Sequence, residues 1–170
     1  GVPLYTTLVA VLENGEPRFG VIHAPAVGET AYAATGAGCW YLAGANAKPV
    51  RARVSDVAAV RESLVLTTEI KSFAENRRGN ALDLFLQLQQ AARVLRTGRD
   101  RYGYLILAIG RAEVMIDPIV NLWDAAALQP VIEEAGGHFG DWDGNVTIRA
   151  GEALATNMCV RDEVLTKLRQ

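Results

Sequence analysis

The chain has 170 residues, of which 50% are hydrophobic and 21% charged, as is typical of one ordinary globular domain. Its formal net charge of −2 comes from 17 basic and 19 acidic residues, so charge favours neither nucleic acid nor an anionic membrane as a partner. The sequence shows neither an apolar run of about 18 residues nor a signal peptide, and its two cysteines are too few for a disulfide framework. We therefore expect a cytoplasmic protein with reduced cysteines.

The first forty residues predict an antiparallel β meander. Strands are expected at residues 5–13, 18–25, 29–35 and 39–44. Asn14-Gly15 is a strong hairpin signal, because both residues tolerate a positive φ. Gly36-Ala37-Gly38 is interpreted as a turn rather than a phosphate cradle, because no helix follows it.

The rest of the chain alternates strands and helices after a loop or edge segment at 43–63. Strands are expected at 63–69, 93–98, 113–117, 138–145 and 152–157, and helices at 80–95, 100–112, 124–137 and 160–169. The face predicted to be buried on the first helix consists of Leu82, Phe85, Leu86, Gln89 and Ala92. Pro130 should kink the third helix, and Gly136-Gly137 should end it. This order predicts an α/β fold with a mixed sheet, not a doubly wound nucleotide fold.

Hydrolysis by a serine or cysteine nucleophile is not indicated. Ser55, Ser63 and Ser72 all lie outside any Gly-x-Ser-x-Gly pattern. His23 and His138 are interpreted as ordinary structural or surface histidines. The sequence has neither His-x-x-x-His nor Cys-x-x-Cys spacing, which argues against zinc.

Two carboxylates are the remaining candidates for a site. Asp117 ends a predicted strand and Asp124 opens a predicted helix, which are the places where α/β proteins gather ligands. Asp124 has two interpretations at this point: a helix N-cap, or an oxygen ligand for a hard cation such as Mg²⁺. A basic cluster of Arg93, Arg96, Arg99 and Arg101 is interpreted as a solvated edge, with an anion site as the alternative.

The stretch "WDAAALQPVIEEAGG" resembles the Trp-Asp-x-Ala-Ala … Glu-Ala-Gly-Gly signature of the inositol monophosphatase family. The resemblance covers nearly the whole chain, including "GVPLYTTLVAVLENGEPRFGVIHAP". It implies a layered αβαβα fold and a Mg²⁺-dependent, lithium-sensitive phosphomonoesterase. The family's main metal motif, Asp-Pro-x-Asp-Gly-Thr, lies just before the segment that matches Gly1. Residues 1–170 are therefore expected to be the C-terminal two-thirds of one such domain, with its N-terminal part missing.

Within the family, "YGYLILAIGRAEVMIDPIVNLWDAAALQPVIEEAGG" looks most like the bacterial histidinol-phosphatase branch. The resemblance implies that Asp124 binds the second metal ion and that Asp117 contacts the alcohol part of the substrate. Gly98, Arg99 and Asp100 match the loop beside the substrate, and Asp100 would suit a cationic histidinol group. The resemblance assigns no catalytic residue to this chain.

The function implied is hydrolysis of histidinol phosphate to histidinol and phosphate by an intact enzyme. Two alternatives stay open: an inositol-phosphate or other sugar-phosphate phosphatase, and a non-catalytic short relative that acts as an interaction module. The expected cofactor is Mg²⁺, the expected partner is a small phosphorylated substrate, and the family is commonly homodimeric. The 170-residue chain alone should be inactive, because one carboxylate cannot hold a strongly hydrated Mg²⁺ ion tightly.

Overall fold

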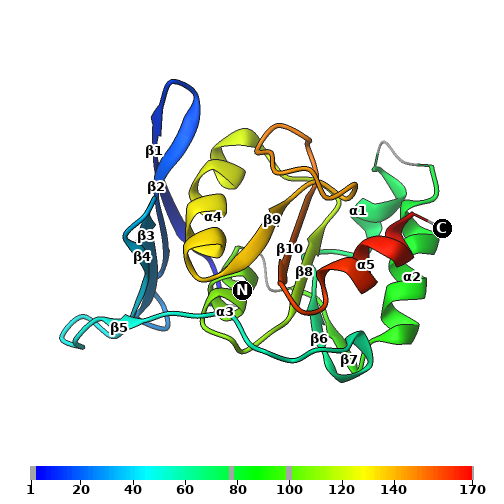
Figure 1. Cartoon of the computed structure of the whole chain (residues 1–170), viewed down its shortest axis with the longest axis horizontal. Coiled ribbons are helices and arrows are strands. Elements are labelled where there is room, and N and C mark those ends of the chain that lie inside the picture. Colours follow the sequence, from blue (N-terminus) through cyan, green and yellow to red (C-terminus); the bar gives the residue numbers. More distant parts are fainter. Residues whose placement is uncertain (1–2, 77–78, 99–100, 170) are drawn as a thin grey trace.

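Sheets and helices alternate in layers across the molecule (Figure 1). The computed structural model describes residues 3–76, 79–98 and 101–169. From one side to the other, the layers are an antiparallel sheet, a pair of helices, a mixed sheet and a second group of helices. The described residues thus form four of the five layers expected for an αβαβα fold, and none of them forms a helix layer outside the first sheet.

The first sheet is the meander that the sequence predicts. Its five strands follow one another in chain order: β1 (Thr7–Glu13), β2 (Glu16–Ala24), β3 (Glu29–Ala34), β4 (Gly38–Ala43) and β5 (Val50–Arg51). Asn14 and Gly15 join the first two strands with φ values of 54° and 83°, the positive values that this tight turn requires. The short strand β5 lies at the edge of the sheet, within the segment expected to be loop or edge.

The second sheet is mixed, as expected. Its strand order is β7 (Val94–Arg96), β6 (Leu64–Leu66), β8 (Val114–Asp117), β10 (Ala153–Asn157) and β9 (Gly137–Gly140). Strand β6 runs parallel to both β7 and β8, whereas β10 is antiparallel to β8 and β9. Because β8 lies at the centre of this sheet, its residues are buried from both sides.

Among the described residues, two helices fill the space between the sheets and three cover the far side of the second sheet. The inner pair is α3 (Tyr102–Ala108) and α4 (Leu122–Glu134), and the outer group is α1 (Lys71–Ala74), α2 (Ala81–Ala91) and α5 (Arg161–Leu168). A single 3₁₀ turn, Val60–Glu62, precedes β6. Helix α1 was not predicted from the sequence and is only four residues long.

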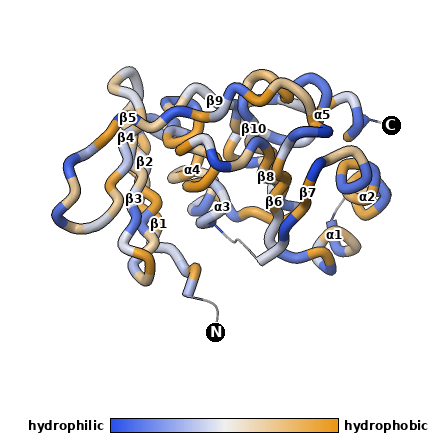
Figure 2. The backbone as a smooth tube through the Cα atoms, turned by 90° about the horizontal axis from the view of Figure 1, so that it is seen from below, coloured by the Kyte–Doolittle hydropathy of each residue, from blue (hydrophilic) through white to orange (hydrophobic). Residues whose placement is uncertain are grey.

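Successive side chains of β8 pack into two different core clusters on opposite faces of the sheet, and this alternation places Asp117 on the face toward α3 and α4. Val114 and Ile116 pack into the cluster that contains α2 and α5, while Met115 packs into the cluster that contains α3 and α4. Since successive strand residues face opposite sides, Asp117 shares the face of Met115. Figure 2 shows the hydrophobic character of β6 and β8 in the interior. Asp117 is therefore a charged residue placed in an otherwise apolar layer.

Close packing of α4 against β2 fixes the helix that carries Asp124. A Cβ atom on Gly20 would overlap the carbonyl oxygen of Ala127, so only glycine lets the strand approach the helix backbone. The alanines at 125, 126 and 127 are all buried, and their small side chains permit the same close approach. The helix continues through Pro130 to Glu134, and Gly136, with φ of 89°, follows its end as predicted.

Two predictions about helices need correction. Helix α4 begins at Leu122 rather than at Asp124: Asn121 has extended backbone angles, and its carbonyl accepts the N–H groups of Asp124 and Ala125. Asn121, a residue type that is common at this position, is therefore the N-cap, and Asp124 is the third helical residue. The cap interpretation of Asp124 is wrong.

The buried face of α2 also differs from the predicted one. The buried residues are Ala81, Leu84, Phe85 and Leu88. Leu82 and Leu86 are instead 36% and 43% exposed. Leucines at every second position allow two helical phases with similar spacing. Phe85 lies on both faces, and what distinguishes the observed phase is that Leu84 and Leu88 pack into the core cluster that also contains residues of α5.

Candidate functional site

Asp117 ends β8 with its carboxylate completely buried between α3 and the neighbouring strand. The hydroxyl of Tyr104 donates to its Oδ2 over 2.9 Å, and the backbone N–H of Thr68 donates to its Oδ1 over 3.3 Å. The Nη1 atom of Arg101 lies 3.4 Å from Oδ2. Each oxygen of this carboxylate therefore has a donor, as a buried charge requires.

Arg101 also binds Asp124, so one guanidinium joins the two acids. Its Nη2 donates to Oδ2 of Asp124 over 2.9 Å. The side chain of Arg101 is 14% exposed and that of Asp124 is 17% exposed, so this ion pair is largely shielded from solvent. Asp124 lies in the first turn of α4, where the positive end of the helix also favours a carboxylate.

Burial and neighbouring charges together raise the pKa values of Asp117, Tyr104 and Arg101. Burial raises the pKa of Asp117 to about 6, although Arg101 and Tyr104 act to lower it. Burial, followed by the charge of Asp117, raises the pKa of Tyr104 well above its ordinary value. Burial lowers the pKa of Arg101, but the two aspartates more than offset this effect, so its pKa rises. Arg101 is therefore the fixed positive charge of the cluster.

A pocket of about 340 Å³ opens beside the ion pair. It is lined by Thr6, Leu8, Arg101, Trp123 and Asp124. Trp123 is 72% exposed at its rim and also borders a second, more apolar pocket of about 370 Å³. The second pocket is lined by Leu8, Ala10, Leu12, Leu122, Trp123 and Ala126. The Arg101–Asp124 ion pair thus borders a polar pocket, and a more apolar pocket, which Trp123 also borders, lies next to it.

Glutamates attach α3 and α4 to the first sheet and so position the cluster. Glu29 on β3 accepts the hydroxyls of Tyr41 and Tyr102, each over 2.7 Å, which anchors the first turn of α3. Burial and the bonds to Glu29 raise the pKa of both tyrosines to about 12. At the far end of α4, Glu134 accepts the backbone N–H groups of Gly36 and Gly38 over 2.7 and 2.6 Å.

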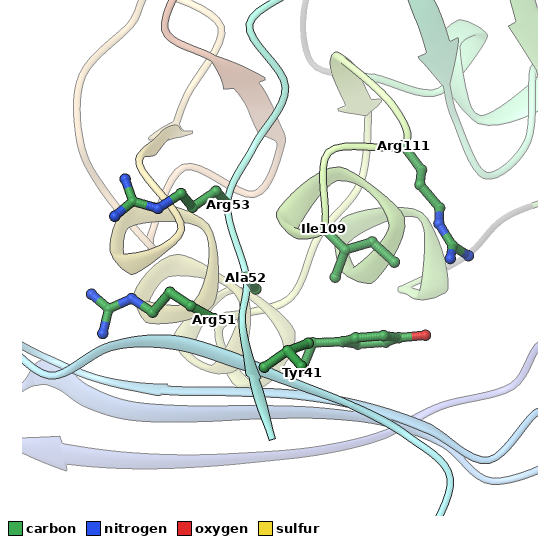
Figure 3. A pocket seen from close by; sticks show the side chains of 7 residues that line it. Tyr41, Arg51, Ala52, Arg53, Ile109 and Arg111 are labelled. Carbon is green, nitrogen blue, oxygen red and sulfur yellow. The ribbon is translucent and has the colours of Figure 1, made fainter. Parts of the chain in front are cut away.

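Another pocket, of about 280 Å³, lies beside β5 and contains three arginines (Figure 3). Arg51 and Arg53 extend to one side of the chain at Ala52, whereas Arg111 extends on the other side of the pocket. Arg51 also donates to the carbonyl of Ala37 over 2.9 Å. Because the three guanidinium groups do not converge, this pocket lacks the geometry of a site for one anion.

The predicted site residues have different outcomes. Asp117 and Asp124 are brought together through Arg101, and Gly98 is connected to them through Thr68, whose carbonyl accepts the Gly98 N–H over 2.8 Å. Arg99 and Asp100 lie outside the described residues. The binding roles of all five residues stay predictions.

Thr68 and Tyr104 were not predicted as part of the site, and the predicted environment of Arg101 is wrong. Arg93 and Arg96 are exposed as expected, but Arg101 is largely shielded from solvent and bound to two acids rather than lying on a solvated edge. One signal in the sequence could have indicated the role of Arg101: the carboxylates of Asp117 and Asp124, if shielded from solvent, require a nearby cation. Arg101 and Tyr104, three residues apart, fall on one helical face.

The described residues do not by themselves fit a Mg²⁺ ion. Carboxylate oxygen is the donor type that Mg²⁺ prefers. However, the described ranges contain no group of three or more His, Cys, Asp or Glu side chains that could hold a metal. The facing oxygens of Asp117 and Asp124 are already bound by Arg101.

The histidines and cysteines agree with their predicted ordinary roles. The ring of His23 bonds the hydroxyl of Thr30 across two strands over 2.9 Å, and His138 is buried in β9. Cys39 is buried and Cys159 exposed, and both are free thiols. Burial raises the pKa of the Cys39 thiol to about 12, so it is a poor nucleophile.

Comparison with known proteins identifies the family. The profile of the inositol monophosphatase family matches residues 1–170. The chain belongs to the inositol monophosphatase family. Its fold class is likewise that of solved members. The chain superposes on an IMPase of Thermotoga maritima with a TM-score of 0.82 at 28% identity, covering 99% of this chain and 62% of that one.

A second solved structure agrees. The TM-score with an inositol monophosphatase of Anabaena is 0.85 at 28% identity, over 99% of this chain and 65% of that one. The resemblance seen in the Trp-Asp segment is therefore confirmed at the level of family and fold. In the part of the chain that the structure describes, none of the helices is both long and apolar enough to cross a membrane.

Curated relatives carry the names of phosphatases. A histidinol-phosphatase of Mycobacterium tuberculosis is 35% identical over 99% of this chain and 63% of its own length. Another, of Chlorobaculum parvum, is 38% identical over 92% of this chain and 57% of its own length. A fructose-1,6-bisphosphatase/inositol-1-monophosphatase of Thermotoga maritima is 30% identical over 97% of this chain. The chain thus spans about three-fifths of the length of these relatives.

Proposed function

We propose that the whole protein hydrolyses small phosphomonoesters, with histidinol phosphate as its substrate and Mg²⁺ as its cofactor. The family match over residues 1–170 carries this proposal. The two relatives named histidinol-phosphatase, at 35% and 38% identity, favour the substrate. Family members are generally metal-dependent, which supports the cofactor.

The roles proposed for this chain follow from its two acids. Asp124 is partly exposed beside the 340 Å³ pocket, so its carboxylate is the group that we assign to a metal ion. Asp117 would contact the alcohol of the substrate, but its side chain is fully buried beneath Arg101 and Tyr104. Contact with substrate therefore requires Arg101 to move. Gly98, Arg99 and Asp100 would line the same side of the substrate.

The test compares substrates on a chain that also carries the family's amino-terminal metal motif. Phosphate release from histidinol phosphate should exceed release from inositol 1-phosphate by at least about tenfold in kcat/KM, the range that a few differential contacts supply. In the same chain, Asp124→Asn should reduce kcat by about a hundredfold or more with little loss of stability. Undiminished activity of that variant would remove Asp124 from the metal site.

A second candidate is an inositol-phosphate or sugar-phosphate phosphatase. The relative of Thermotoga maritima, whose name includes both fructose-1,6-bisphosphatase and inositol-1-monophosphatase, favours it. Equal or faster turnover of inositol 1-phosphate in the comparison above would select this candidate over the histidinol-phosphate assignment.

The 170-residue chain by itself should release no phosphate in a Mg²⁺-dependent manner, since its described residues contain no metal cluster. Mg²⁺-dependent release by this chain would contradict that expectation. A well-folded, specific oligomer without activity would instead favour the interaction-module alternative. Light scattering of the chain with the amino-terminal motif tests the homodimer that the family implies.

A further inference from the structure

We propose that Arg101 is the resident cation of the Asp117–Asp124 pair, so that Arg101 and a divalent cation exclude each other at Asp124. The proposal concerns this chain's own side chains. It rests on the proposed function only for its consequence in the enzyme, where a metal ion could bind Asp124 only after the guanidinium withdraws.

The first support is the position of the guanidinium. Its two terminal nitrogens are divided between the acids, with Nη2 2.9 Å from Asp124 and Nη1 3.4 Å from Asp117. A planar guanidinium suits this bridging role, because its donors form a rigid fork that matches carboxylate oxygens. A cation bound between the two acids would have to occupy the same space.

The second support is the balance of charge. Asp117 is fully buried and Asp124 is 17% exposed, so both carboxylates that Arg101 contacts lie in a region that solvent reaches poorly. A buried pair of this kind is tolerated only when a positive charge compensates it. Other acids in the molecule are also buried, namely Glu113, Asp141 and Glu152. The cation that contacts both Asp117 and Asp124 is Arg101.

The third support is that Arg101 has room to move. Arg101 precedes α3, so its backbone lies at the end of a helix rather than within one. The 340 Å³ pocket borders its side chain and also exposes the ring of Trp123. An arginine released into this pocket would meet an aromatic face, a favourable partner for a guanidinium.

Other arginines in the described ranges do not share this arrangement. Arg111 lies 3.9 Å from Glu29 and is 64% exposed, so a cation there would be screened by water. The arginines of the pocket in Figure 3 extend away from one another. These residues supply matched controls of the same side-chain type.

The experiment titrates Mn²⁺ into the 170-residue chain by calorimetry, without measuring phosphatase activity. We expect no saturation in the wild type up to about 1 mM, the weak end of cation affinities in proteins. Arg101→Gln should bind Mn²⁺ at least about tenfold more tightly, because two carboxylates then lose their internal cation. Adding Asp124→Asn to that variant should abolish the gain.

Two further variants separate charge from shape. Arg101→Lys keeps a cation beside the acids and should bind Mn²⁺ as weakly as the wild type. Arg111→Gln should also leave the affinity at the wild-type level. If Arg101→Gln fails to fold, the test rests on Arg101→Lys. Mn²⁺ binding by Arg101→Lys as tight as that expected for Arg101→Gln would overturn the proposal. Binding by Arg101→Lys as weak as that of the wild type would support it.

Equal Mn²⁺ affinity of the wild type and Arg101→Gln would overturn the proposal, whether both bind or neither does. Failure of the phosphatase assay described above would leave the calorimetric result unchanged. The two proposals can therefore fail separately.

Discussion

The two ends of α4 each hold a carboxylate, but they satisfy it in different ways. At the carboxyl end, Glu134 accepts two backbone N–H groups from Gly36 and Gly38. Near the amino end, Asp124 accepts a guanidinium from a side chain, and that guanidinium is shared with Asp117. The first arrangement uses donors that cannot leave, whereas the second uses a donor on a rotatable side chain.

This difference separates a structural contact from a candidate site. Backbone donors hold Glu134 as part of the link between helix and sheet, and replacing them would require the Gly-Ala-Gly turn to unfold. The Arg101 side chain can exchange for another cation without any change in the fold. A ligand would therefore bind near the amino end of α4, where the carboxylate of Asp124 is held by a movable cation beside a pocket.

Removing the cation should have the largest effect on stability. Arg101→Gln leaves two carboxylates without compensation in a poorly solvated region, so we expect a loss of about 4 kcal/mol at neutral pH. Urea unfolding in the presence of a chelator measures it. Arg111→Gln, at an exposed ion pair, should change stability by less than about 1 kcal/mol. Equal losses in the two variants would contradict the distinction.

The comparison also requires α4 to be held firmly along its middle. Gly20→Ala forces a methyl group against the Ala127 carbonyl, and we expect it to cost about 3 kcal/mol because neither backbone can yield easily. Gly79→Ala is the matched control, since no atom lies within 4 Å of a Cβ there. Thermal unfolding compares the two. A harmless Gly20→Ala would mean that α4 is less closely packed on β2.

Asp117 should make stability depend on pH. Burial raises its pKa from 3.8 to about 6, so its contribution is greatest below about pH 3.8 and is lost as the pH rises through 6. The loss should be on the order of 3 kcal/mol. Asp117→Asn cannot ionise and should lack this decline. Parallel stability profiles of the wild type and the variant between about pH 4 and pH 7 would contradict the assignment.

The smallest effect is expected at the other end of α4. Glu134→Gln replaces one accepting carboxylate oxygen with an amide nitrogen, which donates but cannot accept, and this should cost about 1.5 kcal/mol. It should leave Mn²⁺ binding by Arg101→Gln unchanged, because this end of the helix has no exchangeable cation. A change in that affinity would show that the two ends of α4 are coupled.

Much of the fold could be predicted from local signals in the sequence. The Asn14-Gly15 turn, the alternating strands and Gly136 after α4 each depend on backbone preferences of a few residues. The phase of α2 could not be predicted, because it depends on the packing of Leu84 and Leu88 into a core cluster that also contains residues of α5. The start of α4 was misplaced because Asn121 and Asp124 are both good cap residues.

The candidate site was predictable in part. Asp117 and Asp124 were found because strand and helix ends gather ligands, and the structure brings them together. The role of Arg101 depends on α3 folding back over β8, a tertiary contact that spacing along the chain does not encode. Thr68 contributes only its backbone N–H, which has no sequence signature.

The most direct test of the account is a crystal structure, with Mn²⁺, of the chain carrying the family's amino-terminal metal motif. Anomalous scattering locates the ion without reference to activity. The account predicts Mn²⁺ bound to Asp124 and the Arg101 guanidinium withdrawn from its 2.9 Å contact with that carboxylate. Mn²⁺ bound elsewhere, with Arg101 still joined to Asp124, would contradict it.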